Sequence, residues 1–214
     1  MKMTNKNYFA IGIPTINRVD LLEETLLKYK DDFPNTDIFI MDNGNQVWTI
    51  KDQLPPNFHF IINEVNVGVA ASWNKLLALI FEENEHGLII NDDIYFGKKE
   101  HEVIDFLTTE HKIFSTTTGT WCNFIINYDV FTHIGGFDEK FFPAYYEDND
   151  YAYRLKLNGI TPITTEFLNP EIFRNSMTIQ KSPELNQNFE KNKQYYIQKW
   201  GGLPGEETRT TEFF

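Results

Sequence analysis

Three carboxylates fall within four positions of the sequence, between aromatic residues. They are Glu147, Asp148 and Asp150, in the segment YYEDNDYAYRLKLNG at residues 145–159. Like charges at this spacing repel one another unless a proton, a cation or open water relieves the repulsion. The cluster therefore has two interpretations. It is either the solvated start of a helix, where acidic side chains favour the positive end of the helix dipole, or a catalytic base held above a substrate.

A second acidic group follows an apolar run, in the segment IINDDIYF at residues 89–96. Here Asn91 precedes two adjacent carboxylates, Asp92 and Asp93. A hard cation such as Mg²⁺ or Mn²⁺ takes oxygen ligands and often needs only one or two carboxylates in addition to substrate phosphates. Because Asn and Asp are also common turn residues, a simple turn is the alternative interpretation of this segment.

Several other chemistries lack the residues that they need. The sequence contains neither G-x-G-x-x-G nor G-x-x-x-x-G-K-[ST], the motifs of dinucleotide and P-loop sites. It also lacks the G-x-S-x-G motif of serine hydrolases. The five histidines, at positions 59, 86, 101, 111 and 133, do not pair at zinc-ligand spacing, and Cys122 has no second cysteine.

The amino-acid composition indicates which classes of partner and which cellular compartment suit this protein. The formal net charge is −12 and the isoelectric point is about 4.8, so the surface repels nucleic-acid polymers and anionic lipid. A lone cysteine excludes an internal disulfide and favours a reducing compartment. No apolar run approaches ~18 residues, the length of a transmembrane helix, and the first residues show no signal-peptide pattern. We therefore expect a soluble, intracellular protein of the cytoplasm.

The first half of the chain alternates strand and helix patterns. Apolar runs predict strands at residues 8–14, 37–44, 58–64 and 86–96, and apolar residues at spacings of three and four predict helices over 19–33 and 69–80. This alternation predicts an α/β fold with a parallel sheet covered on both faces. Ligands of such sheets bind beyond the carboxyl ends of the strands. That rule selects three loops in advance: PTINR, DNGN and NDD.

The second half is less regular. We expect a strand, a short helix and a Gly-Gly turn within 121–138, a helix over 148–159, a short strand within 161–167 and a final helix over 183–200. The residues after it are expected to fray or to dock loosely. The chain is expected to form one domain, 1–214, with a nucleotide-binding half at about 1–96, an acceptor and catalytic half at about 97–200, and a tail at 201–214.

Five segments, in their order along the chain, resemble the GT-A glycosyltransferases, most closely the family-2-like, rhamnosyltransferase-like enzymes. They are IPTINR, MDNGN, NVGVAASWN, NDD and GGFDEKFFPAYYEDNDYAYRLKLNG. The resemblance extends over about residues 8–165, and the third and fifth segments are its most specific parts. It implies the GT-A (nucleotide-diphospho-sugar transferase) fold, a mostly parallel central sheet flanked by helices.

The resemblance also implies a role for each matching residue. The residues implied around the nucleotide are Pro14, Thr15, Asn17, Asp42, Asn43, Asn66, Gly68, Asn91 and Asp92. Among them Asp42 and Asn43 would face a uracil base, the Asn66–Gly68 loop would close over the nucleoside, with Asn74 behind it, and Asn91 or Asp92 would hold the ribose. Asp93 would hold the metal. Glu147 and Asp148 would form the family's catalytic acidic pair, with Asp148 as the base. Trp121, Gly136, Tyr146 and Arg174 would border the sugar and the acceptor.

Two positions depart from the family pattern. Asn91 stands where the family has the first aspartate of its D-x-D motif, so one negative charge is absent. Arg174 lies where many relatives have a histidine that binds the metal, and an arginine cannot bind a cation. Either fewer protein ligands hold the metal, or Arg174 contacts phosphate directly.

Residues and resemblance together predict a metal-dependent glycosyltransferase. It would move a hexose from a nucleotide-diphospho-sugar, expected to be a UDP-sugar, to a hydroxyl of a glycan or glycoside, with Mn²⁺ or Mg²⁺ as cofactor. Positive charge would stabilise the diphosphate leaving group, and a carboxylate would take the acceptor's proton. Such a base favours inversion of the configuration at the transferred sugar, and retention is the alternative. The alternatives are a nucleotide-sugar pyrophosphorylase, which would need a Gly-rich loop with Arg and Lys near the N-terminus, and a non-catalytic or degenerate sugar- or nucleotide-binding domain.

Overall fold

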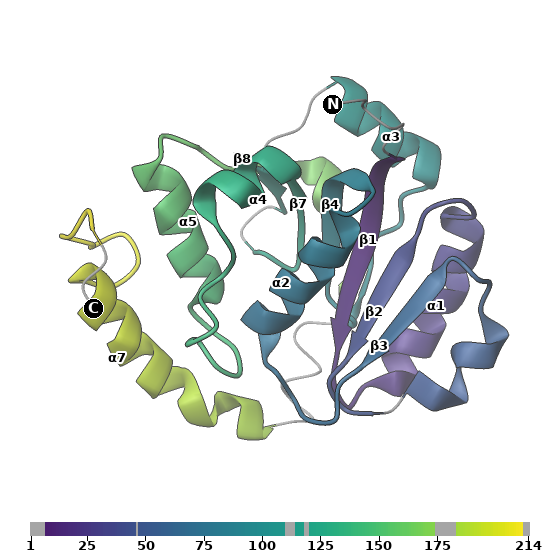
Figure 1. Cartoon of the computed structure of the whole chain (residues 1–214), viewed down its shortest axis with the longest axis horizontal. Coiled ribbons are helices and arrows are strands. Elements are labelled where there is room, and N and C mark those ends of the chain that lie inside the picture. The colour runs from purple at the N-terminus through teal and green to yellow at the C-terminus, as the bar shows by residue number, and fades with distance from the viewer. Residues whose placement is uncertain (1–6, 46, 110–113, 118–119, 174–182, 212–214) are drawn as a thin grey trace.

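A seven-stranded sheet forms the centre of the molecule, with strand order β3-β2-β1-β4-β7-β6-β8 (Figure 1). The computed structural model describes residues 7–45, 47–109, 114–117, 120–173 and 183–211. A separate two-stranded sheet pairs β5 with β9. Most neighbouring strands of the main sheet are parallel, which confirms the predicted mostly parallel α/β architecture.

The first four strands of the main sheet and the helices between them match the predicted alternation. The parallel strands are β1 (Asn7–Thr15), β2 (Ile38–Asp42), β3 (Phe58–Ile62) and β4 (Asn84–Ile90). Helix α1 (Val19–Asp32) follows β1, two 3-10 turns, η1 (Val47–Thr49) and η2 (Lys51–Gln53), follow β2, and α2 (Val69–Ile80) follows β3. The carboxyl ends of the parallel strands therefore meet at one edge of the sheet.

The predicted strand over 86–96 is in fact two strands. β4 ends at Ile90, and a turn closed by the Ile94 N–H and the Asn91 carbonyl, 3.3 Å apart, leads into β5 (Ile94–Tyr95). β5 leaves the main sheet and pairs with β9 (Ile172–Phe173). Apolar residues resume at Ile94 directly after the polar turn, because β5 is also buried at its start, so the sequence pattern shows the two strands as one.

The second half contains the antiparallel part of the sheet. β7 (Asn123–Asn127) runs antiparallel to both β4 and β6 (Phe114–Thr116), and β8 (Ile163–Thr164) pairs with β6. The remaining elements are α3 (Glu100–Thr109), α4 (Tyr128–Ile134), α5 (Glu147–Leu157), η3 (Glu166–Leu168), η4 (Pro183–Asn188) and α7 (Phe189–Trp200). The sequence patterns did not predict α3 or β6. No helix in the described part of the chain is long and apolar enough to cross a membrane.

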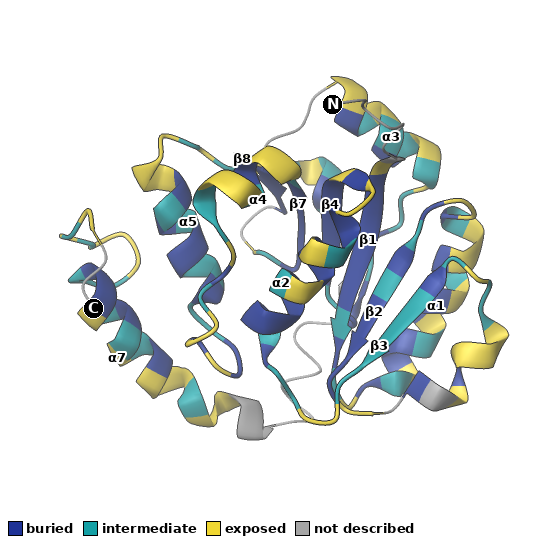
Figure 2. Ribbon diagram, in the orientation of Figure 1, coloured by how far each residue is buried: buried dark blue, intermediate teal, exposed yellow. Residues whose placement is uncertain are grey.

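Helices cover both faces of the sheet, and the strands between them are largely buried (Figures 1 and 2). Alternate residues of β1 face opposite cores: Ile11 and Ile13 pack with α1 and α3, and Ala10 packs with α2, α4 and α5. Helix α2 lies close against the sheet, because a Cβ atom on Gly12 would lie 3.1 Å from the Leu76 Cβ. This close packing fixes the first turn of α2 beside the strand ends.

The C-terminal segment docks on α5 and α7 rather than loosely. The Tyr153 hydroxyl donates to the Arg209 carbonyl at 2.8 Å, and the Tyr196 hydroxyl donates to Glu207 at 2.6 Å. The Arg209 N–H also bonds to the Trp200 carbonyl at 3.1 Å. Described residues of the tail therefore hold α7 against α5.

Candidate functional site

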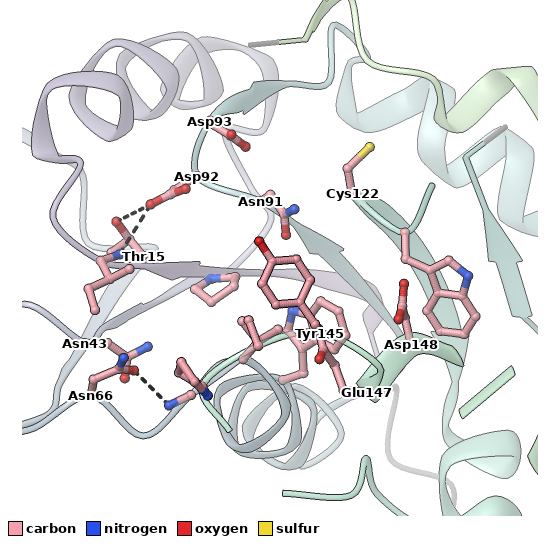
Figure 3. Close-up of a pocket in the computed structure, with 18 of the residues that line it drawn as sticks. Thr15, Asn43, Asn66, Asn91, Asp92, Asp93, Cys122, Tyr145, Glu147 and Asp148 are labelled. Carbon is pink, nitrogen blue, oxygen red and sulfur yellow. Dashed lines mark hydrogen bonds between the residues drawn. The ribbon is translucent and has the colours of Figure 1, made fainter. Parts of the chain in front are cut away.

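A cavity of about 320 Å³ opens at the carboxyl edge of the parallel strands (Figure 3). Its walls come from the ends of β1 and β4, the start of α2, the 120–122 segment and the turn before α5. The lining residues are Pro14, Thr15, Ile16, Asn43, Asn66, Gly68, Val69, Trp73, Asn91, Asp92, Asp93, Thr120, Trp121, Cys122, Pro143, Ala144, Tyr145, Glu147 and Asp148. Most of the residues singled out in the sequence thus lie around one cavity.

One end of the cavity is organised by Asp92. The Thr15 hydroxyl donates to the Asp92 Oδ2 at 2.7 Å, and the Ile16 N–H approaches the same oxygen at 3.4 Å. Both Thr15 and Asp92 are buried. Because β1 and β4 are neighbours in the sheet, this bond ties two strand ends together and fixes the direction of the carboxylate. Asp93 lies beside it and is also buried.

The loop before α2 is fixed by asparagine side chains. Asn43 donates from Nδ2 to the Ser72 Oγ at 2.9 Å, and its Oδ1 accepts from the Val67 N–H at 3.3 Å. Asn66 accepts from the Gly68 N–H at 2.8 Å. Gly68 has φ of +85°, and a Cβ there would lie 2.9 Å from the Phe142 ring. Glycine is therefore needed at this position for both conformation and space.

Two residues predicted around the nucleotide lie outside the lining. The carboxylate of Asp42 is buried and accepts from the Gly44 N–H at 2.8 Å and from the Val47 N–H at 3.0 Å. It therefore closes the loop after β2. Asn17 is exposed and has φ of +56°. Its neighbours Thr15 and Ile16 line the cavity in its place.

Two residues predicted near the sugar or acceptor, Gly136 and Tyr146, also lie outside the lining. The Gly136 carbonyl accepts from the Arg154 guanidinium at 2.7 Å, on the outer side of α5. The Tyr146 ring packs against Phe189, with ring centroids 5.5 Å apart. Arg174 is outside the described residues. Trp121 lines the cavity, and its place beside the sugar and acceptor stays a prediction.

Glu147 and Asp148 form the other end of the cavity, where α5 begins. Tyr145 and Tyr146, just before them, have φ of +80° and +74°, a region that non-glycine residues rarely adopt. Such strained residues concentrate at functional sites. In the view of Figure 3, Tyr145 stands between this acidic pair and the group formed by Thr15 and Asp92.

The two carboxylates have different environments. Glu147 is buried, and among the described residues its Oε2 has no hydrogen-bond partner. Burial raises the pKa of Glu147 well above its usual range, and the nearby charge of Asp148 raises it further. Asp148 is partly exposed and accepts from the Asn149 N–H at 2.7 Å. Desolvation raises the pKa of Asp148 too, while backbone N–H groups oppose that rise.

Asp150 belongs to a different network from its two acidic neighbours. Its carboxylate is buried and receives the Lys199 ammonium at 2.8 Å, the Trp200 indole N–H at 2.8 Å and the Arg154 guanidinium at 2.9 Å. These contacts attach α5 to α7. The three acidic residues in the first turn of α5 therefore point in two directions. Asp150 bonds to α7 and holds the helix in place, and Glu147 and Asp148 face the cavity.

The cavity is strongly acidic. Its described lining contains four carboxylates, from Asp92, Asp93, Glu147 and Asp148, and no lysine, arginine or histidine. Within the described ranges no group of three or more His, Cys, Asp and Glu side chains is arranged to hold a metal ion. Asp92 and Asp93 each have one carboxylate. Mg²⁺ often uses only one or two carboxylates when phosphates and water complete its coordination.

Some lining residues were not selected from the sequence. They are Ile16, Val69, Trp73, Thr120, Cys122, Pro143, Ala144 and Tyr145. Most are direct neighbours of predicted site residues, and that adjacency was the signal that could have identified them. Trp73 is different, because its helical spacing predicted a core residue. It is a core residue, with only 3% of its surface exposed, and it lines the cavity as well.

Comparison with known proteins gives the fold and a family match. The family model described as Glycosyl transferase family 2 matches residues 10–132. No curated protein matches this sequence. Among solved structures, a protein assigned to the nucleotide-diphospho-sugar transferases from Desulfovibrio desulfuricans G20 is 11% identical, with a TM-score of 0.52, over 87% of this chain and 97% of that one.

Two further structures share the architecture. The 4-diphosphocytidyl-2C-methyl-D-erythritol synthase from Anaerococcus prevotii DSM 20548 is 11% identical, with a TM-score of 0.52, over 84% of this chain and 96% of that one. Rv0371c from Mycobacterium tuberculosis H37Rv is 8% identical, with a TM-score of 0.50, over 83% and 98% of the two chains. At these identities the likeness shows the fold, and it confirms the GT-A architecture predicted from the sequence.

Proposed function

The chain belongs to glycosyl transferase family 2, and we propose that it moves a hexose from a UDP-sugar to a hydroxyl of a glycan or glycoside. The observation that carries this proposal is the arrangement of acidic residues around one cavity. Asp92 and Asp93 lie at the strand ends, and Glu147 and Asp148 lie at the start of α5. Glycosyl transfer needs positive charge on the diphosphate, which a cation held by carboxylates would supply. It also needs a base that takes the proton of the acceptor hydroxyl.

The donor is proposed to bind along the strand ends. Pro14, Thr15, Asn43 and the Asn66–Gly68 loop line that side of the cavity, beside Asp92. Their amide and hydroxyl groups suit a nucleoside, and the hydrogen bonds around Asn43 and Asn66 hold the loop in place before a ligand arrives. Asp42 holds the neighbouring loop after β2 through its bonds to the backbone N–H groups of Gly44 and Val47.

A divalent cation, Mn²⁺ or Mg²⁺, is proposed to neutralise the diphosphate when bound at Asp93. The support is electrostatic, because a diphosphate would otherwise enter a cavity whose described lining holds four carboxylates and no basic side chain. Asp92 has a different part in this proposal, since its Oδ2 already accepts from Thr15. Asp92 is proposed to face the ribose of the donor, beside the cation at Asp93.

Asp148 is proposed as the base that takes the acceptor's proton. A general base works best with a pKa near the operating pH. Strong burial keeps Glu147 protonated to higher pH, whereas Asp148 is partly exposed and its pKa is raised less strongly. A neutral carboxyl cannot accept the proton, so the difference in burial between the two side chains favours Asp148. A single displacement by the activated hydroxyl would invert the configuration of the sugar.

The two alternative functions make different demands on the site. A nucleotide-sugar pyrophosphorylase would use a glycine-rich loop with basic residues after the first strand, and here that loop contributes Pro14, Thr15 and Ile16 to the lining. A non-catalytic binding domain would not require a buried acidic pair facing the cavity. Neither alternative accounts for Glu147 and Asp148 as well as transfer does.

A donor screen tests the proposal. The protein is mixed with UDP-, GDP-, dTDP- and CMP-sugars, with and without Mn²⁺, and thermal stabilisation identifies the donor. Each stabilising donor is then incubated with simple glycosides, and the release of nucleoside diphosphate is followed. Stabilisation by a UDP-sugar with acceptor-dependent release of UDP supports the proposal. Glycan binding that needs neither nucleotide nor metal, with no release, would favour a binding domain. Formation of pyrophosphate when the protein is given UTP and a sugar 1-phosphate instead would favour a pyrophosphorylase.

A further inference from the structure

The strained turn before α5 forms part of the cavity wall. Pro143, Ala144 and Tyr145 line the cavity, and Glu147 begins the helix directly afterwards. Tyr145 and Tyr146 both have positive φ. A backbone of this shape persists only where its surroundings fix it, so the residues that hold this turn also determine where the acidic pair lies.

Asn192 of α7 holds the turn. Its side chain is 1% exposed, and its Nδ2 lies 2.8 Å from the Ala144 carbonyl and 3.3 Å from the carbonyls of Phe142 and Tyr145. A carboxamide nitrogen carries two N–H donors, so one side chain serves successive carbonyls of the turn. The Phe189 ring, one turn earlier on α7, packs edge-on against Tyr145 with centroids 5.1 Å apart.

Helix α7 is itself anchored to α5. The buried ammonium of Lys199 lies 2.7 Å from the Asp138 carboxylate and 2.8 Å from that of Asp150. The Trp200 indole N–H donates to Asp150 as well. Moving α7 away would leave buried charges unpaired, which is strongly unfavourable. Asn192 is therefore presented to the turn from a fixed support.

The donor side of the cavity is held by other elements. Thr15 and Asp92 bond to each other, Asn43 bonds to Ser72 of α2, and Asn66 bonds to Gly68. The family match covers residues 10–132 and ends before α5 and α7. The two sides of the cavity thus rest mainly on different elements, and they meet where the Val69 N–H of α2 bonds to the Pro143 carbonyl of the turn. A change in α7 should therefore affect the turn more than the donor side.

We propose that Asn192 is a positioning residue that fixes the 142–146 turn and thereby sets where Asp148 and Tyr145 meet the acceptor. This inference rests on the proposed transfer function and deepens it, because it assigns the acceptor side of the site to α7. Asn192 acts through the turn and does not itself touch the reacting groups.

Asn192→Asp tests the proposal, because it keeps the shape of the side chain and replaces the N–H donor with an oxygen that repels the carbonyls. Gln198→Glu is the matched control, since it makes the same amide-to-carboxylate change at an exposed position of α7. With the full chain, Asn192→Asp should lower kcat by about 10²-fold, the effect of a small displacement of a catalytic group. Its affinity for UDP should not change, and Gln198→Glu should keep the wild-type kcat.

A second variant tests the proposal if Asn192→Asp does not fold. Asn192→Ala removes the donor without adding a charge, and it should show the same loss of kcat with intact UDP binding. Wild-type kcat in either folded variant would overturn the proposal. So would a parallel loss of kcat and UDP affinity, because that pattern indicates general damage to the structure.

Hydrogen exchange separates this proposal from the proposed function. The Val69 N–H donates to the Pro143 carbonyl at 2.8 Å, so its exchange rate reports the position of the turn without any substrate. Faster exchange at Val69 in Asn192→Ala supports the positioning role even if the wild-type protein transfers no sugar. Unchanged exchange contradicts it whatever the activity.

Discussion

The Thr15 hydroxyl donates a 2.7 Å hydrogen bond to the Asp92 carboxylate, across the ends of neighbouring strands β1 and β4. Both residues are buried, so the bond is shielded from water and its loss leaves a carboxylate oxygen poorly satisfied. This hydroxyl therefore helps to fix the direction of Asp92, and with it the wall on which the donor is proposed to bind.

Thr15→Val should therefore lower the free energy of unfolding by about 1.5–3 kcal/mol, the contribution of a hydrogen bond to a charged group. Valine keeps the shape of threonine and removes only the hydroxyl. Chemical denaturation measures the change, and Thr132→Val, at an exposed position of α4, is the control. UDP affinity should also weaken in Thr15→Val. Equal stability of the two variants would show that the bond contributes little.

UDP binding should depend on a divalent cation and on Asp93. The described lining of the cavity offers no basic side chain to the diphosphate, so removing the cation leaves phosphate facing carboxylates. Calorimetric titration of UDP in Mn²⁺ and in EDTA measures this, with Asp93→Ala as the variant. Affinity should fall in EDTA, and Asp93→Ala should lose most of its response to Mn²⁺. Equal affinity in both buffers would remove the cation from the proposal and direct attention to Arg174.

The sequence predicted an element correctly when a single short segment contained the whole pattern, and it failed when the element depends on a distant partner strand. β1 to β4 are apolar runs separated by turn residues or helices, and each could be identified separately. The break between β4 and β5 could not, because the partner strand β9 lies far along the chain and both segments are buried. The sequence pattern shows that residues are buried, but it does not show which neighbour buries them.

The same limit applies to the candidate site. Asp92 and Asp42 both follow apolar strands, and the pattern treats them alike. In the structure Asp92 lines the cavity, whereas Asp42 accepts two backbone N–H groups. Tyr145 and Tyr146 are adjacent aromatic residues with positive φ, and of the two only Tyr145 is in the described lining of the cavity. Backbone conformations of this kind leave no clear signal in a single sequence.

Gly68→Ala and Gly135→Ala form a matched pair. Both glycines have φ near +85° with extended ψ, so alanine at either position should cost on the order of 1–3 kcal/mol of backbone strain. A Cβ at Gly68 would also press on Phe142 and on the Pro143 carbonyl, whereas a Cβ at Gly135 would meet nothing within 4 Å. Thermal unfolding should therefore show the larger loss for Gly68→Ala. UDP affinity should fall in that variant alone, and equal losses would contradict the tight packing of the loop.

Glu147→Gln should stabilise the protein at neutral pH. The folded pKa of Glu147 is raised above its unfolded value, so the folded state holds the proton more tightly than the unfolded state. Its contribution to stability is then present at low pH and is lost as pH rises from the ordinary glutamate pKa of 4.5 to the raised folded pKa. Glutamine mimics the neutral form at every pH. Urea unfolding across this range should show the variant gaining on the wild type as pH increases, and parallel pH curves would contradict the burial argument.

If Asp148 is the base, the transfer rate should decrease on the acidic side of its pH profile. Ionised Asp148 accepts the proton, so kcat should fall as pH decreases through its raised pKa. Steady-state rates measured across the acidic range with saturating donor and acceptor test this. A rate that stays constant below the usual pKa of aspartate would exclude Asp148 as the base.

The most direct measurement is the transfer rate of Asp148→Asn, which conserves shape and removes only the charge. The proposal predicts a loss of roughly 10²–10⁴-fold, the usual contribution of a positioned proton acceptor. UDP affinity should be unchanged, and Glu147→Gln should lose much less. Asp129→Asn, which makes the same change at an exposed position in the first turn of α4, should transfer sugar at the wild-type rate. A large loss in Glu147→Gln with a small one in Asp148→Asn would assign the base to Glu147, and wild-type transfer by both variants would contradict a catalytic role for the pair.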